Sequence, residues 1–269
     1  MEIEVKNQTD DELIFIIRDA DVPFVNAIRR IAMMEVPNLA IDDVYIVQND
    51  SAMFDEVLAH RLGLTPLFSS LEDVAGFVDA DECDCDDHCP KCSVSFTLNK
   101  EGPGTVYSKD LISSDSKIKP VYDTIPLVKL KEDQIIELEA YARVGIGKEH
   151  AKWVPTTVCA YKQYPEITFN ENVSVEYGVA DACPRDILEA DRENKCVIVK
   201  EDKIEDCSLC GACVRASENG YINVGYQENN FIFKIETDGS ISPKEVLLKS
   251  CDILSDKADD VIRFTEGGK

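Results

Sequence analysis

The chain has 269 residues, 44% hydrophobic and 30% charged, which suffices for two or three small domains with packed cores. Acidic residues outnumber basic residues by 52 to 28, and the formal net charge is −24. Because nucleic-acid binding relies on lysine and arginine at the phosphates, this charge argues against direct nucleic-acid contact, except through a local patch such as Arg29-Arg30. No apolar run approaches the ~20 residues that cross a bilayer, and the N-terminus lacks a signal-peptide pattern, so we expect a cytoplasmic protein without a membrane segment.

The N-terminal segment predicts a hairpin followed by a helix. Residues 2–6 and 12–18 are rich in apolar side chains, and polar turn residues separate them. Asp21 can cap the helix that follows, with Pro23 in its first turn and Pro37 beyond its end. The apolar positions of this helix recur at three- and four-residue spacings: Phe24, Val25, Ile28, Ile31 and Ala32.

The middle of the chain alternates between strands and short breaks. An extended segment is predicted at 44–47, and a short helix at 52–62 that ends in a left-handed cap at Gly63. Residues 69–92 lose their periodicity and become acidic and cysteine-rich, which indicates a loop. Further strands are predicted at 93–98, 135–144 and 154–161. A break at Tyr164-Pro165 then begins a new unit of about 60 residues, which ends near residues 227–230.

The C-terminal segment predicts a strand, a turn and a long helix. The strand covers 231–235, and Ser242-Pro243-Lys244-Glu245 has the pattern of a capping box with proline at the first helical position. A helix of roughly 20 residues would be about 30 Å long. Its apolar stripe packs either on its own domain or against another subunit. The stripe consists of Leu247, Cys251, Leu254, Ala258 and Val261.

Eight of the eleven cysteines fall into two groups, which in a cytoplasmic chain indicates metal or redox chemistry more than disulfides. The first group lies in residues 83–92, with the sequence Cys-Asp-Cys-Asp-Asp-His-Cys-Pro-Lys-Cys. Four thiolates this close fit one structural zinc ion, which would order the acidic loop. His88 could replace one thiolate, and a thioredoxin-type pair at the last two cysteines is the alternative. The predicted ligands are Cys83, Cys85, Cys89 and Cys92.

The second cysteine group has a more specific spacing. The segment Cys207-Ser-Leu-Cys210-Gly-Ala-Cys213 has the C-x2-C-x2-C pattern with which bacterial-type ferredoxins supply three ligands of an iron–sulfur cluster. Their fourth ligand is a cysteine followed by proline, and Cys183-Pro184 supplies it here. We therefore predict one [4Fe-4S] cluster, with a [3Fe-4S] form, zinc or an emptied relic as alternatives. The predicted ligands are Cys183, Cys207, Cys210 and Cys213.

A second cluster of the ferredoxin type is not predicted. It would need cysteines at three positions that hold Val173, Glu176 and Val179, and another where Ser217 stands. Nor does the sequence contain a phosphate-binding glycine loop or a specific nucleophile–base pattern, and it has only three histidines. We predict no catalytic residues in this chain. The remaining cysteines are interpreted as buried thiols: Cys159, Cys196 and Cys251.

Three further motifs resemble the alpha-like subunits of RNA polymerase. Residues 24–37, Phe-Val-Asn-Ala-Ile-Arg-Arg-Ile-Ala-Met-Met-Glu-Val-Pro, resemble the first helix of that family, with its Asn-Ala-x-Arg-Arg core before a proline. Residues 55–67, Asp-Glu-Val-Leu-Ala-His-Arg-Leu-Gly-Leu-Thr-Pro-Leu, resemble its next signature. Residues 145–153, Gly-Ile-Gly-Lys-Glu-His-Ala-Lys-Trp, are similar to the third-subunit branch of archaea and eukaryotes, and the ferredoxin-like insert is similar to that of the archaeal D-type members of the family.

The resemblance covers essentially the whole chain and implies an α+β fold with three parts. Residues 1–40 and 229–269 would form a discontinuous alpha-like dimerisation domain. Residues 41–167 would form an inserted, mostly β domain that carries the zinc loop. Residues 168–228 would form a ferredoxin-like iron–sulfur domain.

The resemblance also implies a non-catalytic assembly role in transcription. The chain would form a heterodimer with the small subunit L, recruit the small subunits N and P, and nucleate the two large catalytic subunits, which hold the nucleotidyltransferase site. The cluster would be a structural staple or a redox sensor. The alternative is a ferredoxin-type electron-transfer module, which leaves the terminal motifs unexplained. The predicted partner-facing residues are Phe24, Ile28, Ile31, Leu247, Leu254 and Val261.

Overall fold

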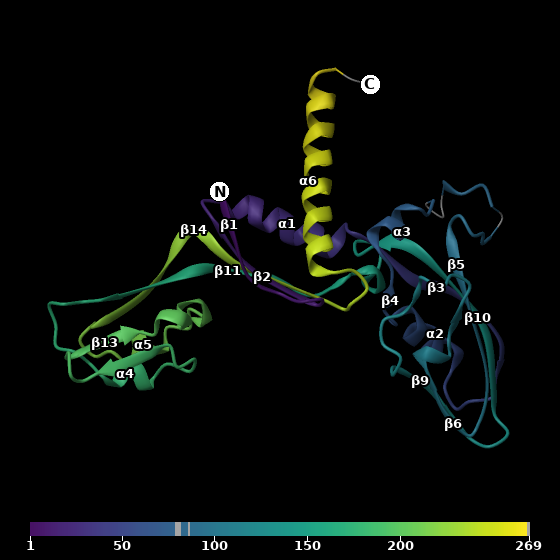
Figure 1. Cartoon of the computed structure of the whole chain (residues 1–269), viewed down its shortest axis with the longest axis horizontal. Coiled ribbons are helices and arrows are strands. Elements are labelled where there is room, and N and C mark those ends of the chain that lie inside the picture. Colours follow the sequence, from purple (N-terminus) through teal and green to yellow (C-terminus); the bar gives the residue numbers. More distant parts are fainter. Residues whose placement is uncertain (79–81, 86, 268–269) are drawn as a thin grey trace. The chain divides into compact units, whose positions relative to one another are not determined.

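The structure is a computed structural model that describes residues 1–78, 82–85 and 87–267. Its chain divides into two compact units, and each unit is assembled from separate segments (Figure 1). The first unit comprises Met1–Lys6, Ile14–Val25 and Ala160–Phe233. The second unit comprises Asn7–Leu13, Asn26–Cys159 and Lys234–Lys269. Each unit therefore depends on contacts between residues that are far apart in the sequence.

Most of a four-stranded sheet, with the strand order β1-β2-β14-β11, belongs to the first unit. Phe15 stacks on Phe233 with ring centroids 5.2 Å apart, and Tyr161 stacks on Phe233 at 6.0 Å, so rings from three strands share one core. The predicted hairpin at 2–6 and 12–18 is confirmed as β1 and β2. The bounds are Glu2–Gln8 for β1, Glu12–Arg18 for β2, Thr156–Phe169 for β11 and Ile222–Thr237 for β14.

The predicted break at Tyr164-Pro165 is wrong, because β11 runs through both residues to Phe169. β11 is an outer strand of the sheet, where the missing N–H of a proline need not cost a ladder hydrogen bond. β14 also begins at Ile222, well before the strand predicted at 231–235, because its polar first half hides the strand pattern.

The cysteine-rich part of the first unit is a small fold with its own core. β12 (Leu188–Asp191) pairs antiparallel with β13 (Cys196–Val199), and two short helices, α4 (Gly178–Asp181) and α5 (Ala212–Ala216), accompany this hairpin. The 3₁₀-helix η4 (Glu201–Asp206) leads into the C-x2-C-x2-C segment. The apolar core holds few side chains, and Cys213 is one of its members. The other buried members are Val179, Ala180, Leu188, Val197, Tyr221 and Ile222.

The second unit is built on an antiparallel sheet with the order β3-β10-β5-β7. The central strand β10 is paired on both sides, and Ala140 lies opposite Val44 of β3 and Phe96 of β5. The strands predicted at 44–47, 93–98 and 135–144 are confirmed and are longer than predicted. Their bounds are Pro37–Asn49 for β3, Ser93–Glu101 for β5, Ile112–Ser113 for β7 and Ile135–Ile146 for β10.

Helix α2 packs with this sheet in a shared core and is flanked by small two-stranded sheets. It covers Asp55–Gly63, and the predicted left-handed cap at Gly63 is wrong, because Gly63 is helical and Leu64 caps the helix with φ −89°. A short helix, α3 (Leu71–Ala75), begins the region predicted as a loop, and Ser70 and Asp73 form its capping box. The small sheets pair β4 (Leu67–Phe68) with β8 (Lys119–Pro120), and β6 (Gly104–Tyr107) with β9 (Pro126–Leu130).

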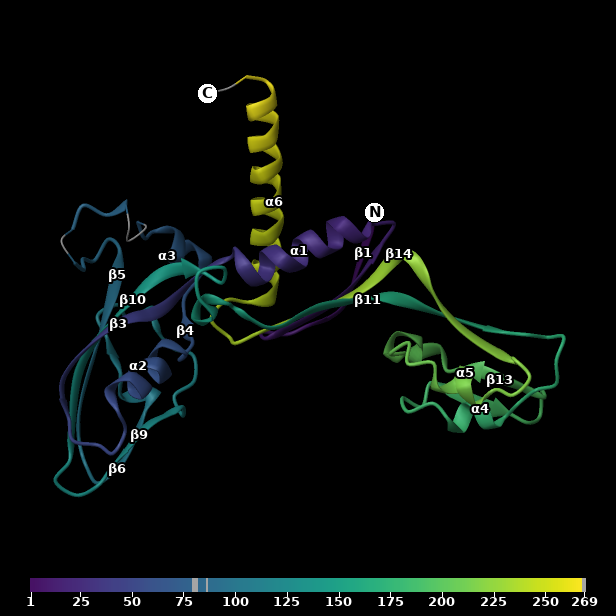
Figure 2. The same ribbon diagram turned by 180° about the vertical axis from the view of Figure 1, so that it is seen from behind.

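Two longer helices match the predicted terminal helices. α1 covers Val22–Met34, and α6 covers Pro243–Thr265 with the predicted capping box between Ser242 and Glu245. Figure 2 shows α6 from the opposite side as one unbroken helix. Its buried residues are confined to the first turns, at Pro243, Val246 and Ser250. Among the described helices, none has the length and hydropathy that a bilayer crossing requires.

Candidate metal centres

The first cysteine group brings four sulfur atoms together. The Sγ atoms of Cys83, Cys85, Cys89 and Cys92 all lie within 4.8 Å of one another. The Sγ–Sγ distance is 3.6 Å for Cys83–Cys89 and for Cys85–Cys92, and 3.7 Å for Cys89–Cys92. A tetrahedral ion with metal–sulfur bonds of about 2.3 Å spaces its sulfurs by about 3.8 Å. The residues present therefore fit a single tetrahedral metal ion.

The start of β5 positions the end of this loop. The backbone N–H groups of Cys92 and Ser93 both donate to the carbonyl of Cys89, at 3.1 and 2.9 Å. This turn brings two of the sulfurs together directly before the paired strand. On the other side, the N–H of Val78 donates to the carbonyl of Lys91 at 2.9 Å. Part of the loop, at residues 79–81 and 86, lies outside the described residues.

His88 does not join the four sulfurs but attaches the loop to the sheet. Its ring stacks on Tyr141 of β10 with centroids 4.1 Å apart and an angle of 8° between the planes. Tyr45 of β3 meets the same imidazole edge-on and donates a hydrogen bond to Asp87 at 2.9 Å. The aromatic contacts thus hold the loop against β3 and β10, and the four-cysteine set needs no histidine.

The thiols of this group differ in acidity. The neighbouring Cys83 thiol, with the other sulfurs and burial, raises the pKa of Cys85 to about 12. A hydrogen bond from the backbone N–H of Lys91 is the main cause that lowers the pKa of Cys89 to about 7. Cys89 is therefore a readily available thiolate near neutral pH.

The second cysteine group lines a different kind of site. Cys183, Cys207, Cys210 and Cys213 border one pocket, whose other walls are mostly aliphatic. All four residues are described, yet no three of their sulfurs lie within 4.8 Å of one another. Four cysteines around an aliphatic pocket suit the corners of a larger inorganic group. The aliphatic walls come from Ile167, Pro184, Ile187, Leu188 and Val224.

The backbone turns sharply within the second group. Leu209 and Gly211 both have left-handed φ angles, 54° and 67°, and α5 begins directly after them. Strain at a non-glycine residue such as Leu209 is typical of functional sites. The backbone N–H of Ala212 is the main cause that lowers the pKa of Cys210, so amide donors point at a sulfur there. Such hydrogen bonds to sulfur are typical of cluster sites.

The positions that would hold a second ferredoxin cluster carry a polar network and core packing. The Ser217 hydroxyl donates to the Glu176 carboxylate, which also accepts from the backbone N–H groups of Glu218 and Asn219. These donors lower the pKa of Glu176, with Ser217 the largest cause. Val179 is fully buried in the small core. A hydrogen-bonded carboxylate and a valine thus occupy places where ligands would stand.

The three remaining cysteines lie apart from both groups. Cys159 is buried, which raises the pKa of its thiol to about 12. Cys196 is half-buried in β13, so its interpretation as a buried thiol is confirmed only in part. The interpretation of Cys251 as a buried thiol is wrong, because it is exposed on α6. In the stripe that contains it, Leu247 and Leu254 are half-buried, whereas Ala258 and Val261 are exposed.

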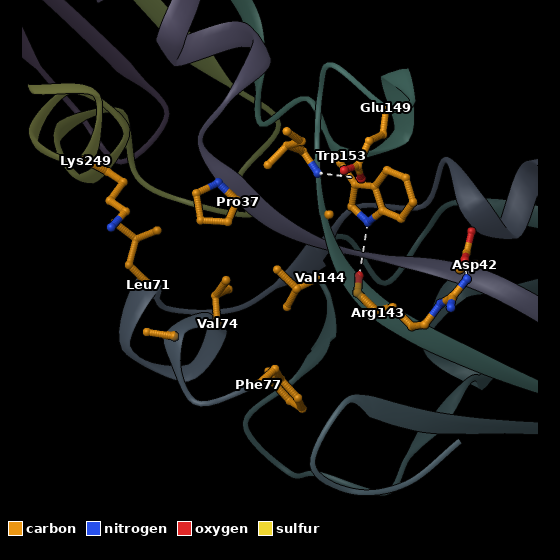
Figure 3. Close-up of a pocket in the computed structure, with 13 residues that line it drawn as sticks. Pro37, Asp42, Leu71, Val74, Phe77, Arg143, Val144, Glu149, Trp153 and Lys249 are labelled. Carbon is orange, nitrogen blue, oxygen red and sulfur yellow. Dashed lines mark hydrogen bonds and ion pairs between the residues drawn. The ribbon is translucent and has the colours of Figure 1, made fainter. Parts of the chain in front are cut away.

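A groove of about 500 Å3 lies in the second unit between α3, the ends of β3 and β10, and α6 (Figure 3). Leu71 and Phe77 line it opposite the indole of Trp153, whose N–H donates to the Arg143 carbonyl at 3.0 Å. Asp42 and Arg143 also line the groove, and they form an ion pair with each other. Among the described residues that line this groove, no nucleophile stands beside a free base.

Comparison with known proteins defines the class of this fold. Residues 44–156 match the RNA polymerase Rpb3/RpoA insert domain, so the sheet of the second unit is that of an RNA polymerase subunit. The chain is 62% identical over its full length to DNA-directed RNA polymerase subunit Rpo3 of Methanobrevibacter smithii, covering 99% of that protein. It is 55% identical to Rpo3 of Methanothermobacter thermautotrophicus, with both chains fully covered, and 33% identical to DNA-directed RNA polymerase II subunit rpb3 of Dictyostelium discoideum, with 97% of this chain and 93% of that one covered.

The chain therefore belongs to the Rpo3 family of DNA-directed RNA polymerase subunits. Its function lies in transcription, and the predicted non-catalytic role is confirmed, because only the assembled polymerase is the enzyme. The resemblance to the alpha-like subunits is likewise confirmed at the level of the family.

Proposed function

We propose that the chain is an assembly scaffold of a cytoplasmic archaeal polymerase, with α1 and α6 forming the interface to the small subunit L. The observation that carries this proposal is the exposed second half of α6. From Cys251 to Thr265 the helix spans about 22 Å, and its side chains are mostly exposed. Val261 is 64% exposed and Phe264 82% exposed. Large apolar side chains gathered on one exposed helix are typical of a subunit interface.

The predicted interface residues divide by exposure. Phe24 is 36% exposed, and Leu247 and Leu254 are half-buried, so these and Val261 are open to a partner. Ile28 and Ile31 are buried within the chain, where they would set the position of α1 without direct contact. The small subunits N and P and the large catalytic subunits would then join the heterodimer, and the net charge of −24 supports little direct contact with nucleic acid.

Co-purification with L tests this interface. Leu254→Asp places a charge in the apolar seam, and we expect at least about a tenfold loss of L, since burying an unpaired charge costs several kcal/mol. Ser255→Asp, which adds the same charge at an exposed polar position of α6, is the matched control. Equal recovery of L with Leu254→Asp and wild type would rule out this interface.

We also propose that the two cysteine groups hold different metals. The short sulfur–sulfur separations at Cys83, Cys85, Cys89 and Cys92 support a structural zinc ion. The wider arrangement of the second group, its aliphatic walls and the amide donor at Cys210 support one [4Fe-4S] cluster, with a [3Fe-4S] form if one ligand is labile. Metal analysis of anaerobically purified protein should find one zinc and about four irons with matching sulfide per chain.

The cluster would act as an internal staple of the small fold in the first unit. That fold has a thin core, in which Cys213 itself is a member. A small core gains stability from a bound group that forms only in the folded state. Loss of the cluster in oxidising conditions would then loosen this part of the chain and impair assembly, which would couple polymerase supply to iron or oxygen. Unchanged assembly of cluster-free Cys210→Ser protein with the large subunits would contradict this role.

A further inference from the structure

The loop that ends in Cys207 is tied to both outer strands of the four-stranded sheet. From β11, the Lys162 ammonium donates to the carbonyl oxygens of Glu205 and Cys207, the latter at 2.9 Å. From β1, the Lys6 ammonium pairs with the Glu205 carboxylate at 2.6 Å. β1 and β11 are at opposite ends of the strand order, so η4 and Cys207 are held from two sides.

Lys162 is the less expected of the two lysines. Its side chain is half-buried, and its ammonium ends at the carbonyl oxygens of Glu205 and Cys207. A partly buried ammonium is costly unless oxygen acceptors and opposite charge compensate it. The two carbonyl oxygens supply the acceptors, and a cluster-bound Cys207 would supply the opposite charge. A contact that only fastened the loop to the surface of the sheet would not need a buried ammonium. The burial of Lys162 therefore indicates a role at the cysteine site.

The ion pair between Lys6 and Glu205 is more exposed and belongs to a small network of ion pairs. Lys6 also pairs with Glu4 at 2.9 Å, and Glu4 accepts from Arg18 of β2 at 3.2 Å. The hydrogen bonds that Lys6 donates to the carboxylates of Glu205 and Glu4 raise its pKa, so its charge is retained at neutral pH. Because these groups face solvent, the network fixes geometry more than it contributes energy.

We propose that Lys162 is a positioning residue for the iron–sulfur site, which holds the Cys207 backbone in ligating geometry and places a fixed positive charge beside that thiolate. This inference rests on the proposal that Cys207 and its three partner cysteines hold a cluster. Two consequences follow from the contacts. The hydrogen bonds from Lys162 to the two carbonyl oxygens slow the detachment of Cys207 from a bound cluster. The positive charge stabilises the reduced, more negative state and so raises the reduction potential, in keeping with the influence of hydrogen bonds and net charge on cluster potentials.

Substitution of Lys162 tests both consequences together. Lys162→Met keeps the length of the side chain but removes its charge and donors, and Lys162→Arg keeps both. In anaerobically purified full-length protein, we expect Lys162→Met to lower the midpoint potential in a redox titration and to lose its visible cluster absorbance several-fold faster in air. Lys162→Arg should restore both quantities toward wild type. Arg192→Met removes a cation from an exposed turn of the same fold and should change neither.

Lys6→Met provides a second test if Lys162→Met does not fold. Of the contacts that hold this loop, the variant removes only the ion pair with Glu205, so the cluster should be lost faster while the midpoint potential stays near wild type. A wild-type protein with full iron content, alongside Lys162→Met with unchanged potential and loss rate, would overturn this inference and leave the cluster proposal intact. Wild-type protein that contains zinc or no iron at these cysteines would overturn both.

Discussion

The two cysteine groups contain the same number of thiols and solve different structural problems. In the first group, four candidate ligands lie within ten residues, and the turn before β5 brings the sulfurs of Cys89 and Cys92 together. In the second group, Cys183 stands far upstream of the other three, and the β12–β13 hairpin and η4 lie between them. The first site lies beside a sheet whose large core contains none of its cysteines. The second site lies within a small fold whose few core residues include Cys213. Metal loss should therefore be a local event at the first site and a global one for the small fold at the second.

Removal of a cluster ligand is the most severe test of this contrast. Cys213→Ser deletes both a proposed ligand and a member of the small core, so we expect iron to fall from about four per chain to near zero. The segment from α4 to β14 should then become sensitive to limited proteolysis, because folding and metal binding are coupled there. Cys196→Ser, in the same fold but outside the ligand set, should keep its iron. A protease-resistant Cys213→Ser protein would contradict the staple role.

Removal of a zinc ligand should have a smaller structural effect. Cys89→Ser should abolish stoichiometric zinc, yet the core beneath β10 contains none of the loop cysteines and should persist. Hydrogen exchange of the β5 and β10 amides is the measurement, and we expect the free energy of opening to change by about 1 kcal/mol or less. Iron content serves as the internal control. If those amides lost most of their protection, the distinction between a local and a global site would be lost.

Substitution of His88 tests how the zinc loop is attached to the sheet. His88→Ala removes the ring that stacks on Tyr141, a pair worth about 1 kcal/mol, which corresponds to roughly fivefold weaker zinc binding. His88→Phe keeps the stacking and should retain near-normal affinity in a chelator competition. Equal losses for the alanine and phenylalanine variants would show that an imidazole nitrogen, and not the stacked ring, is what the site needs.

The smallest effect concerns the pH dependence of zinc uptake. Folding lowers the pKa of Cys89 from 9.0 to about 7, chiefly through the backbone N–H of Lys91, so its thiolate is favoured in the folded loop. The associated stabilisation is present above the unfolded pKa and is lost as the pH falls through about 7. Zinc uptake by metal-free protein, followed by stopped flow, should accelerate severalfold as pH rises through that value. A rate independent of pH in this range would mean that another thiolate captures the ion first.

Much of the fold could be predicted from local patterns. The hairpin at β1 and β2, the strands β5 and β10, and the capped helix α6 follow from apolar periodicity and cap residues, which act over a few neighbouring positions. The errors arise where tertiary position overrides a local preference. Pro165 is tolerated in β11 because that strand is at the end of its sheet, and the polar half of β14 is a strand because β2 and β11 pair with it.

The sequence by itself determined the family and showed no catalytic pattern. It also determined the two sets of candidate ligands, because spacing along the chain restricts which thiolates can share a metal. Only the tertiary structure decided which side chains surround those ligands. His88 stacks on a tyrosine instead of joining the sulfurs, Cys251 faces outward, and Lys162 reaches the backbone of Cys207 from a strand more than forty residues away in sequence. Such contacts depend on strand pairing between distant segments, and no local pattern encodes that pairing.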